Sequence, residues 1–304
     1  MHPELFRLPF IGLPVHTFGL TVAIAFLLAV HVIHRQALRS GQLADEVLDA
    51  SFWVLLGAII GGRLVFVIVE WRAFFIEAPW VQLTSLGFSI PRILAVWQGG
   101  FVSWGDFFGG VTALMLYARS RKIPVLALVD LFMLAVPLAE AVVRIGCLSA
   151  GCCFGQSAYH LDEAGGVVAN LPLTLRFPPG SIAYSNLLYG SSDQTVQLMH
   201  RLGTTVPLFP WQPVQAVACI ALFYTLLYIA PRKRFHGQVF LTCAIGYSVI
   251  RSFLELFRGD EARGFAVKDL LSTGQFLSIF IVIASIITWV WAARRARQAR
   301  SAPC

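Results

Sequence analysis

Residues 124–148 read PVLALVDLFMLAVPLAEAVVRIGCL and decide the fold class. The run is long enough to cross a bilayer, because a spanning helix needs roughly 20 mostly apolar residues. It nevertheless carries Asp130, Glu140 and Arg144. A charge at bilayer depth costs at least about 2.5–3.5 kcal/mol, so each one is a candidate for function or for a structural ion pair. The segment therefore predicts a membrane helix that contributes charged groups to a site.

The rest of the chain has the same apolar character. Of its 304 residues, 57% are hydrophobic and only 13% are charged, and the mean hydropathy is +0.73. This composition excludes an ordinary soluble domain and predicts an all-α integral membrane protein, a single membrane domain over residues 1–304. Seven segments are predicted to span the membrane: about 16–34, 48–71, 99–118, 124–148, 213–230, 237–257 and 273–293.

The net charge of +7 is a topology signal. Basic clusters follow alternate spans: Arg35 with Arg39, RSRK at 119–122, PRKRFH at 231–236 and RRARQAR at 294–300. Since basic flanks stay in the cytoplasm, the N-terminus is predicted outside and the C-terminus inside. The same distribution argues against a nucleic-acid partner, because the basic residues are spread over four separate loops.

Two segments are predicted on the outer face. Residues 72–98 begin within WRAFFIEAPWVQ (71–82), an amphipathic stretch with tryptophan that suits the membrane interface. Residues 149–212 are rich in Gly, Pro, Ser and Asn and predict a small outer cap between spans four and five.

Two arginines are the leading candidates for a binding site. Arg144 and Arg251 each lie four residues from a glutamate, Glu140 and Glu255 respectively, so each pair shares a helix face. Ion pairs that lock helices together are the structural alternative. Arginine stays protonated and its planar fork suits phosphate, so we predict that both arginines hold one phospholipid headgroup of the outer leaflet.

Several segments, in order, resemble the prolipoprotein diacylglyceryl transferase family. They are HTFGL (16–20), GGRLVFVI (61–68), VWQGG (96–100), DLFMLAVPLAEAVVRIG (130–146) and GYSVIRSFLELFRGD (246–260). The resemblance implies transfer of a diacylglyceryl group from phosphatidylglycerol to the lipobox cysteine thiol of a preprolipoprotein, with release of glycerol phosphate. It also implies a monomeric multi-pass protein of the bacterial inner (plasma) membrane that needs no cofactor.

The resemblance assigns roles to particular residues. Lipid binding falls on Arg144, Arg251, Tyr247, Glu255, Arg63, Gly99 and Gly100. The leaving group is a phosphate ester, so cations must stabilise its developing negative charge. The incoming thiol must become a thiolate, so a base or a lowered pKa is required.

The chain departs from the family in the polar half of the signature. The family's two asparagines fall on Cys147 and Ala150, and its glutamate falls on Cys152. The histidine after the third-span Gly-Gly pair falls on Trp104, and the first-span tyrosine falls on Phe18. The later His-Pro-Ser/Thr-Gln-Leu-Tyr-Glu segment survives only as Pro213 and Gln215. Asp106 is the predicted replacement base, with His16 as the alternative.

Cys147, Cys152 and Cys153 crowd the end of the fourth span. Cys147 and Cys152 are candidate catalytic thiols, since a thiolate beside Arg144 would have a lowered pKa. A disulfide from Cys147 to either neighbour, a zinc site completed by a residue such as His160, and plain packing remain open, and the unusual spacing argues against metal.

Three function classes remain. The leading one is the transferase. A paralogue could move a glyceryl or acyl group to another acceptor, and a non-catalytic member would bind lipid or sense thiol redox state. A transporter is disfavoured, because the charges gather toward the outer face.

Overall fold

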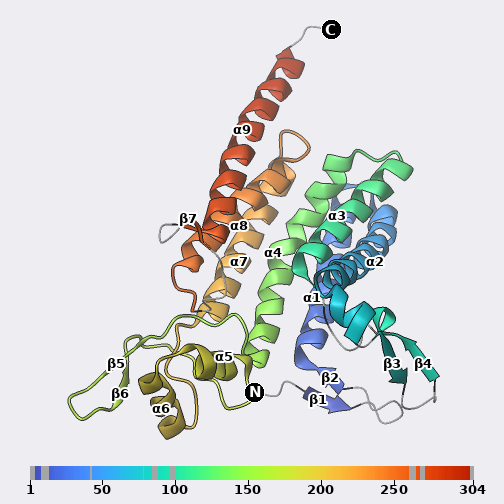
Figure 1. Cartoon of the computed structure of the whole chain (residues 1–304). Helices are drawn as coiled ribbons and strands as arrows, with labels where there is room; N and C mark the ends of the chain where they lie inside the picture. The colour runs from blue at the N-terminus through green and yellow to red at the C-terminus, as the bar shows by residue number, and fades with distance from the viewer. Residues whose placement is uncertain are drawn as a thin grey trace. The chain divides into compact units, whose positions relative to one another are not determined.

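The computed structural model describes residues 4–7, 14–41, 43–77, 79–83, 88–95, 100, 102–259, 265–267 and 271–301. The chain is mostly helical, as predicted, and each predicted span coincides with a helix (Figure 1). These helices are α1 (Thr17–Ser40), α2 (Ala44–Val69), α3 (Ser103–Ser120), α4 (Val125–Ala150), α7 (Trp211–Ile229), α8 (Gln238–Glu255) and α9 (Thr273–Ser301).

Length and apolar composition mark five of these helices as candidate membrane spans. They are Thr17–Ser40, Ala44–Val69, Val125–Ala150, Trp211–Arg232 and Gly274–Gln298. The other two, α3 and α8, are 18 residues long and carry charged residues such as Asp106 and Arg251 within that length. The chain is therefore a multi-span helical protein, and the seven-span count stays a prediction.

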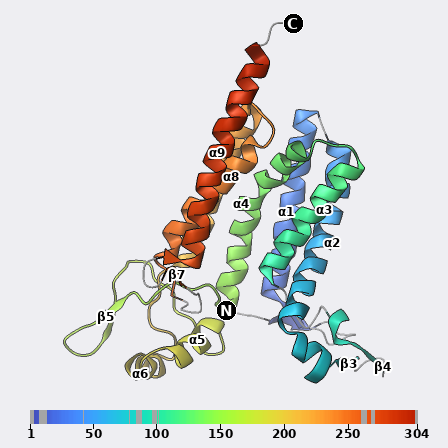
Figure 2. The same cartoon turned by 45° about the horizontal axis from the view of Figure 1, so that its top comes forward.

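The chain divides into two compact units, one of which contains residues 30–131. Its main contact is between α2 and α3, which lie side by side in both views (Figures 1 and 2). A Cβ at Gly57 would lie 2.6 Å from the Cβ of Ala113, and one at Gly61 would lie 2.8 Å from the Cα of Gly109. Both helices thus present glycines four residues apart, which allows the close backbone approach typical of membrane helices.

The same unit holds the predicted interfacial segment, residues 72–98. It contains a π-helical turn (Ala73–Glu77), the antiparallel strands β3 (Trp80–Leu83) and β4 (Phe88–Pro91), and a 3-10 turn (Arg92–Leu94). Trp71 and Trp80 are 51% and 61% exposed, so both rings are free to meet the interface.

The second unit contains residues 14–29 and the chain from Phe132 onward. Here α8 packs against both α7 and α9 (Figure 1). Its helical core contains the buried residues Leu134, Leu222, Leu226, Val239 and Cys243. Gly146 lets α4 approach α1, because a Cβ there would collide with Thr21 and lie 3.2 Å from the ring of Phe18.

Within the second unit, residues 149–212 connect α4 to α7 and form a small cap with its own core. The segment contains the antiparallel strands β5 (Tyr159–Leu161) and β6 (Val167–Ala169) and the helices α5 (Ile182–Gly190) and α6 (Asp193–Leu202). Its own core consists of Phe154, Phe177, Ala183, Leu198, Met199, Val206 and Leu208. The Ser181 side chain caps α5 by accepting a hydrogen bond from the Tyr184 amide at 3.3 Å.

Candidate functional site

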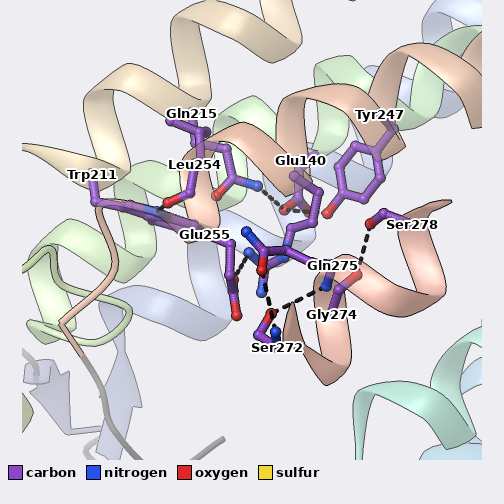
Figure 3. Close-up of polar contacts among 11 residues, drawn as sticks. Glu140, Trp211, Gln215, Tyr247, Leu254, Glu255, Ser272, Gly274, Gln275 and Ser278 are labelled. Atoms are coloured by element: carbon purple, nitrogen blue, oxygen red, sulfur yellow. Dashed lines mark hydrogen bonds and ion pairs between the residues drawn. The ribbon is translucent and has the colours of Figure 1, made fainter. Parts of the chain in front are cut away.

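Three arginines surround one buried tryptophan. Trp211, the first residue of α7, is 1% exposed, and its indole Nε1 donates to the carbonyl oxygen of Leu254 at 2.9 Å (Figure 3). The guanidinium carbons of Arg144, Arg251 and Arg258 lie 5.5, 5.9 and 4.8 Å from its ring centroid. Cation–π attraction therefore gathers charges from α4, α8 and the segment after α8 at one place.

Glu140 links three elements beside this ring. Its Oε1 accepts from Gln215 Nε2 on α7 at 3.1 Å and from Tyr247 Oη on α8 at 3.5 Å (Figure 3). The same oxygen accepts from the guanidinium of Arg144 on its own helix. The side chains of Arg144 and Glu140 are 13% and 23% exposed. The second predicted pair also forms, since Arg251 donates to Glu255, and Glu255 is 8% exposed.

The arginine cluster, defined as Arg144, Arg251 and Arg258 around Trp211, carries a net positive charge and adjoins buried polar atoms without hydrogen-bond partners in the part of the chain that the structure describes. Counted over the described residues, its three guanidinium groups and the carboxylates of Glu140 and Glu255 sum to one net positive charge. Within the same part of the chain, Arg144 Nε, Gln212 Oε1 and Gln215 Oε1 are buried without a hydrogen-bond partner. A buried polar atom left unpaired costs about 1–3 kcal/mol, so these atoms favour a polar, anionic ligand.

The two glutamine side chains have a defined orientation. Gln212 Nε2 donates to the carbonyl oxygen of Cys152 at 2.9 Å, and Gln215 Nε2 donates to Glu140. Because both amide nitrogens face acceptors, both amide oxygens are left to accept from a donor such as a hydroxyl group.

The N-terminus of α9 adjoins the second ion pair. Ser272 and Gln275 cap it reciprocally: the Gln275 amide donates to Ser272 Oγ at 3.1 Å, and the Ser272 amide donates to Gln275 Oε1 at 3.2 Å (Figure 3). A Cβ at Gly274 would lie 3.5 Å from Glu255 Oε1 and 3.8 Å from Arg251 Nη2. The partial positive charge of a helix N-terminus thus adds to that of Arg251.

The three cysteines of the signature form one cluster. Among the described residues, the Sγ atoms of Cys147, Cys152 and Cys153 all lie within 4.8 Å of one another, and the three residues are free thiols. Cys147 is 3% exposed and the other two are half-buried. The Cys152 amide donates to the Cys147 carbonyl oxygen at 3.1 Å, which closes the turn that brings them together.

Cys153, which follows α4, has a thiol pKa below its usual value. Hydrogen bonds from Cys147 and Cys152 lower the pKa of the Cys153 thiol, and the charges of Arg258 and Arg144 act in the same direction against burial. The nucleophile predicted at Cys147 or Cys152 stays a prediction, and Cys153 joins them as a thiol that sequence reasoning left out of the site.

Gly155 allows the chain after the cysteines to pack closely against the segments that carry the arginine cluster. A Cβ there would collide with Phe209. The neighbouring backbone pairs on two sides: the Gln156 amide donates to the Phe257 carbonyl oxygen and the Phe209 amide donates to the Gln156 carbonyl oxygen, both at 2.9 Å. The end of the signature is thereby joined to the chain that carries Arg258.

Arg63, predicted to bind lipid, has a different set of contacts. Its guanidinium donates to backbone carbonyl oxygens of Ile93, Gly100, Arg92 and Ala95 at 2.8–3.2 Å, and the residue is only 6% exposed. It holds the interfacial segment onto α2, and Gly100, with φ +83°, supplies one of these carbonyls. Gly99 lies outside the described residues.

An apolar groove adjoins Arg63. It has a volume of about 740 Å³ and is lined by residues including Ile60, Leu64, Trp71 and Leu94. Its lining suits a hydrocarbon chain.

Asp106, the predicted base, lies in the first turn of α3 and is half-buried. Trp104, at the position of the family's histidine, is 56% exposed and stacks on Phe108 at 5.9 Å. The role of Asp106 stays a prediction. His16 is the last residue of β2 (Pro14–His16), and its side chain is outside the part of the chain that the structure describes.

Sequence reasoning missed the residues that organise the arginine cluster. Trp211 and Gln212 precede Pro213 in a segment that keeps little of the family motif, and Arg258, within the matching 246–260 segment, had no predicted role. The sequence pointed to only one contact in the cluster, the ion pair between Arg144 and Glu140, because Glu140 lies four residues before Arg144 on the same helix face.

The fold and the site define a multi-span membrane protein that gathers arginines, carboxylates and thiols beside a buried tryptophan. The chain belongs to the prolipoprotein diacylglyceryl transferase family, which matches residues 3–291.

Sequence similarity to known relatives extends over nearly the full length of the chain. The phosphatidylglycerol–prolipoprotein diacylglyceryl transferase of Clostridium tetani is 28% identical over 95% of this chain and 97% of its own. The phosphatidylglycerol–prolipoprotein diacylglyceryl transferase 2 of Clostridium perfringens is 28% identical over 91% of this chain and 91% of its own. That of Methylibium petroleiphilum is 29% identical over 93% of this chain and 94% of its own.

Proposed function

We propose that this protein transfers the diacylglyceryl group of phosphatidylglycerol to the lipobox cysteine thiol of a prolipoprotein and releases glycerol phosphate. Family membership indicates this reaction. The observation that carries it in this chain is the arginine cluster, which holds a buried Arg144 Nε without a partner in the described chain.

The cluster suits the phosphodiester of the lipid. A phosphodiester is an anion, which the positively charged cluster attracts, and its oxygens can accept from Arg144 Nε and from Arg251. The head-group glycerol offers hydroxyl donors to the orphaned oxygens of Gln212 and Gln215. The phosphodiester and the glycerol of the headgroup thus supply hydrogen-bond partners for the buried polar atoms that lack one in the described chain.

The same groups assist the reaction. The acceptor sulfur forms a bond to the glyceryl carbon while the bond from that carbon to the phosphate oxygen breaks. Negative charge grows on the leaving phosphate, and guanidinium groups fixed by Glu140, Glu255 and Trp211 stabilise it without reorganising. The acceptor thiol loses its proton, which leaves with the phosphate or passes to water.

The location follows from the same proposal. The chain spans the bacterial inner membrane seven times, with the N-terminus outside and the four basic clusters in the cytoplasm. The arginine cluster then lies toward the outer leaflet, where the 149–212 cap receives the acceptor peptide. Reporter fusions placed after each basic cluster test this topology: activity of an externally active reporter at RSRK or PRKRFH would overturn it.

The experiment is a transfer assay with purified protein, phosphatidylglycerol and a lipobox peptide. Arg144→Gln and Arg251→Gln should each lose most of the transfer rate while they keep the wild-type melting temperature. Arg232→Gln is the matched control, because Arg232 also lies over an aromatic ring, Tyr228 at 4.0 Å, but in a basic loop. Full turnover in both cluster variants would overturn the proposal, and lipid binding without turnover in the wild type would favour a non-catalytic lipid-binding protein.

A further inference from the structure

The thiol cluster of Cys147, Cys152 and Cys153 has no task in the reaction described above. Its three sulfur atoms lie at most 4.8 Å apart. In a tetrahedral zinc site with zinc–sulfur bonds of about 2.3 Å the sulfurs are ~3.8 Å apart. Side-chain rotations that shorten the sulfur–sulfur distances by no more than about 1 Å would therefore give the spacing that a tetrahedral zinc ion requires.

The backbone is bent in a way that holds the three thiols together. Gly151 has φ +71° and Cys153 has φ +54°, so the chain enters the left-handed region twice within three residues after α4 ends. For a residue with a Cβ this conformation costs roughly 1–2 kcal/mol. A Gly at 153 would avoid that cost, but the sequence has a cysteine there, which places its sulfur beside the other two.

Neither a disulfide nor packing alone makes use of all three thiols. A disulfide consumes two thiols and leaves the third, and adjacent Cys152 and Cys153 are poorly placed to bond to each other. Packing accounts for Cys147, which is buried, but it does not require the left-handed Cys153. One metal ion uses all three sulfurs.

We propose that Cys147, Cys152 and Cys153 bind one thiophilic divalent ion, zinc by preference, and leave its fourth position for the acceptor thiol. Three thiolates select soft ions such as zinc. Among the described residues the cluster of potential ligands contains these three cysteines and no fourth member. Three protein ligands with an open position are typical of catalytic zinc, whereas structural sites are closed by four.

The surroundings offset the charge of such a centre. A divalent ion with three thiolates carries one negative charge. Two arginines lie near the thiols: Arg144 precedes Cys147 by three residues on α4, and the backbone of Arg258 bridges to Gly155, two residues after Cys153. Gln212 also holds the Cys152 carbonyl, so the thiol turn is attached to the start of α7, where Trp211 lies. The phosphodiester would then bind through the donors of Arg144 and Arg251 next to the metal centre.

The role in catalysis rests on the proposed transferase function. The acceptor thiol binds at the open position, its proton leaves to water, and the resulting thiolate is the nucleophile. Its sulfur forms the bond to the glyceryl carbon, the carbon–oxygen bond to the phosphate breaks with its electron pair on oxygen, and glycerol phosphate leaves; no group changes oxidation state. A metal-held thiolate needs no neighbouring base, which fits a chain with Trp104 and Cys152 at the positions of the family's histidine and glutamate.

The first test measures metal in the full-length protein purified in detergent. After loading with Zn²⁺ and removal of excess ion, elemental analysis should find about one zinc per chain. Cys147→Ala, Cys152→Ala and Cys153→Ala should each lose most of it. Cys219→Ala is the matched control and should keep it, because Cys219 is a fully buried free thiol on α7 outside the cluster. Wild-type protein that stays zinc-free, or that shows a disulfide among these cysteines by mass spectrometry, would overturn the site.

The second test separates the site from the proposed function. Co²⁺-loaded protein should show thiolate-to-cobalt absorption that changes when a lipobox peptide is added and does not change with the Cys-to-Ser peptide. Metal binding without transfer would refute the transferase and leave the metal site standing. Full transfer by metal-free protein in chelator would refute the metal role and leave the transferase standing. Because this spectrum is read on the wild type, the test holds even where a cysteine variant folds poorly.

Discussion

Glu140→Gln changes the charge at the centre of the site and leaves its shape. The carboxylate accepts from Arg144, Gln215 and Tyr247, and the ion pair with Arg144 is largely buried. Glutamine keeps one acceptor oxygen but loses the charge-assisted bond, which contributes about 1.5–3 kcal/mol when one partner is ionised. If that bond serves to position Arg144, the transfer rate falls roughly 10- to 160-fold.

The expected signature is a fall in kcat without a rise in KM for phosphatidylglycerol. Removing one negative charge makes the cluster more positive, so attraction for the anionic lipid does not weaken. Initial rates over a range of lipid concentrations measure both constants, and thermal unfolding is followed in parallel. Glu163→Gln, an exposed carboxylate in the cap, is the control and should behave as wild type. A raised KM at unchanged kcat, or no change in either constant, would refute this role for Glu140.

Arg144→Lys and Arg251→Lys should each lose most of the rate although charge is kept, because an ammonium lacks the bidentate fork; rates near wild type would show that charge alone suffices. Gly109→Ala should destabilise the protein by about 1–3 kcal/mol through overpacking of α2 against α3, since its Cβ would lie 3.0 Å from Gly61 Cα. Gly190→Ala, at the end of α5 with open space around the new Cβ, should have a smaller effect in the same melting assay, and equal losses would contradict the packing. Exchange of residues 149–212 for the segment of a relative should change which lipobox peptides are accepted, and an unchanged profile would count against the cap.

Hydropathy was sufficient to place the helices, because apolar runs of about 20 residues have few alternatives to a helix in lipid. It was less informative for α3 and α8, whose charged residues reduce their apolar character. The i, i+4 spacing also predicted both ion pairs, since that contact is local to one helix.

What the sequence did not reveal depends on tertiary contacts. Trp211 reads as an ordinary apolar residue at a helix start, and its three arginine neighbours come from segments far apart in the chain. The meeting of three thiols depends on a left-handed Cys153, which no propensity predicts. The sequence also did not reveal that the Arg63 guanidinium donates to backbone carbonyl oxygens, and its lipid-binding role stays a prediction.

The central claim is that the arginine cluster carries transfer of diacylglycerol from phosphatidylglycerol to a lipobox thiol. The most direct measurement is mass spectrometry of a lipobox peptide incubated with the purified protein in phosphatidylglycerol vesicles. The peptide should gain one diacylglyceryl group on its cysteine while glycerol phosphate appears in equal amount, and Arg144→Gln should remove most of both products. An unmodified peptide with the wild-type protein, under conditions where the Clostridium tetani relative modifies it, would contradict the claim.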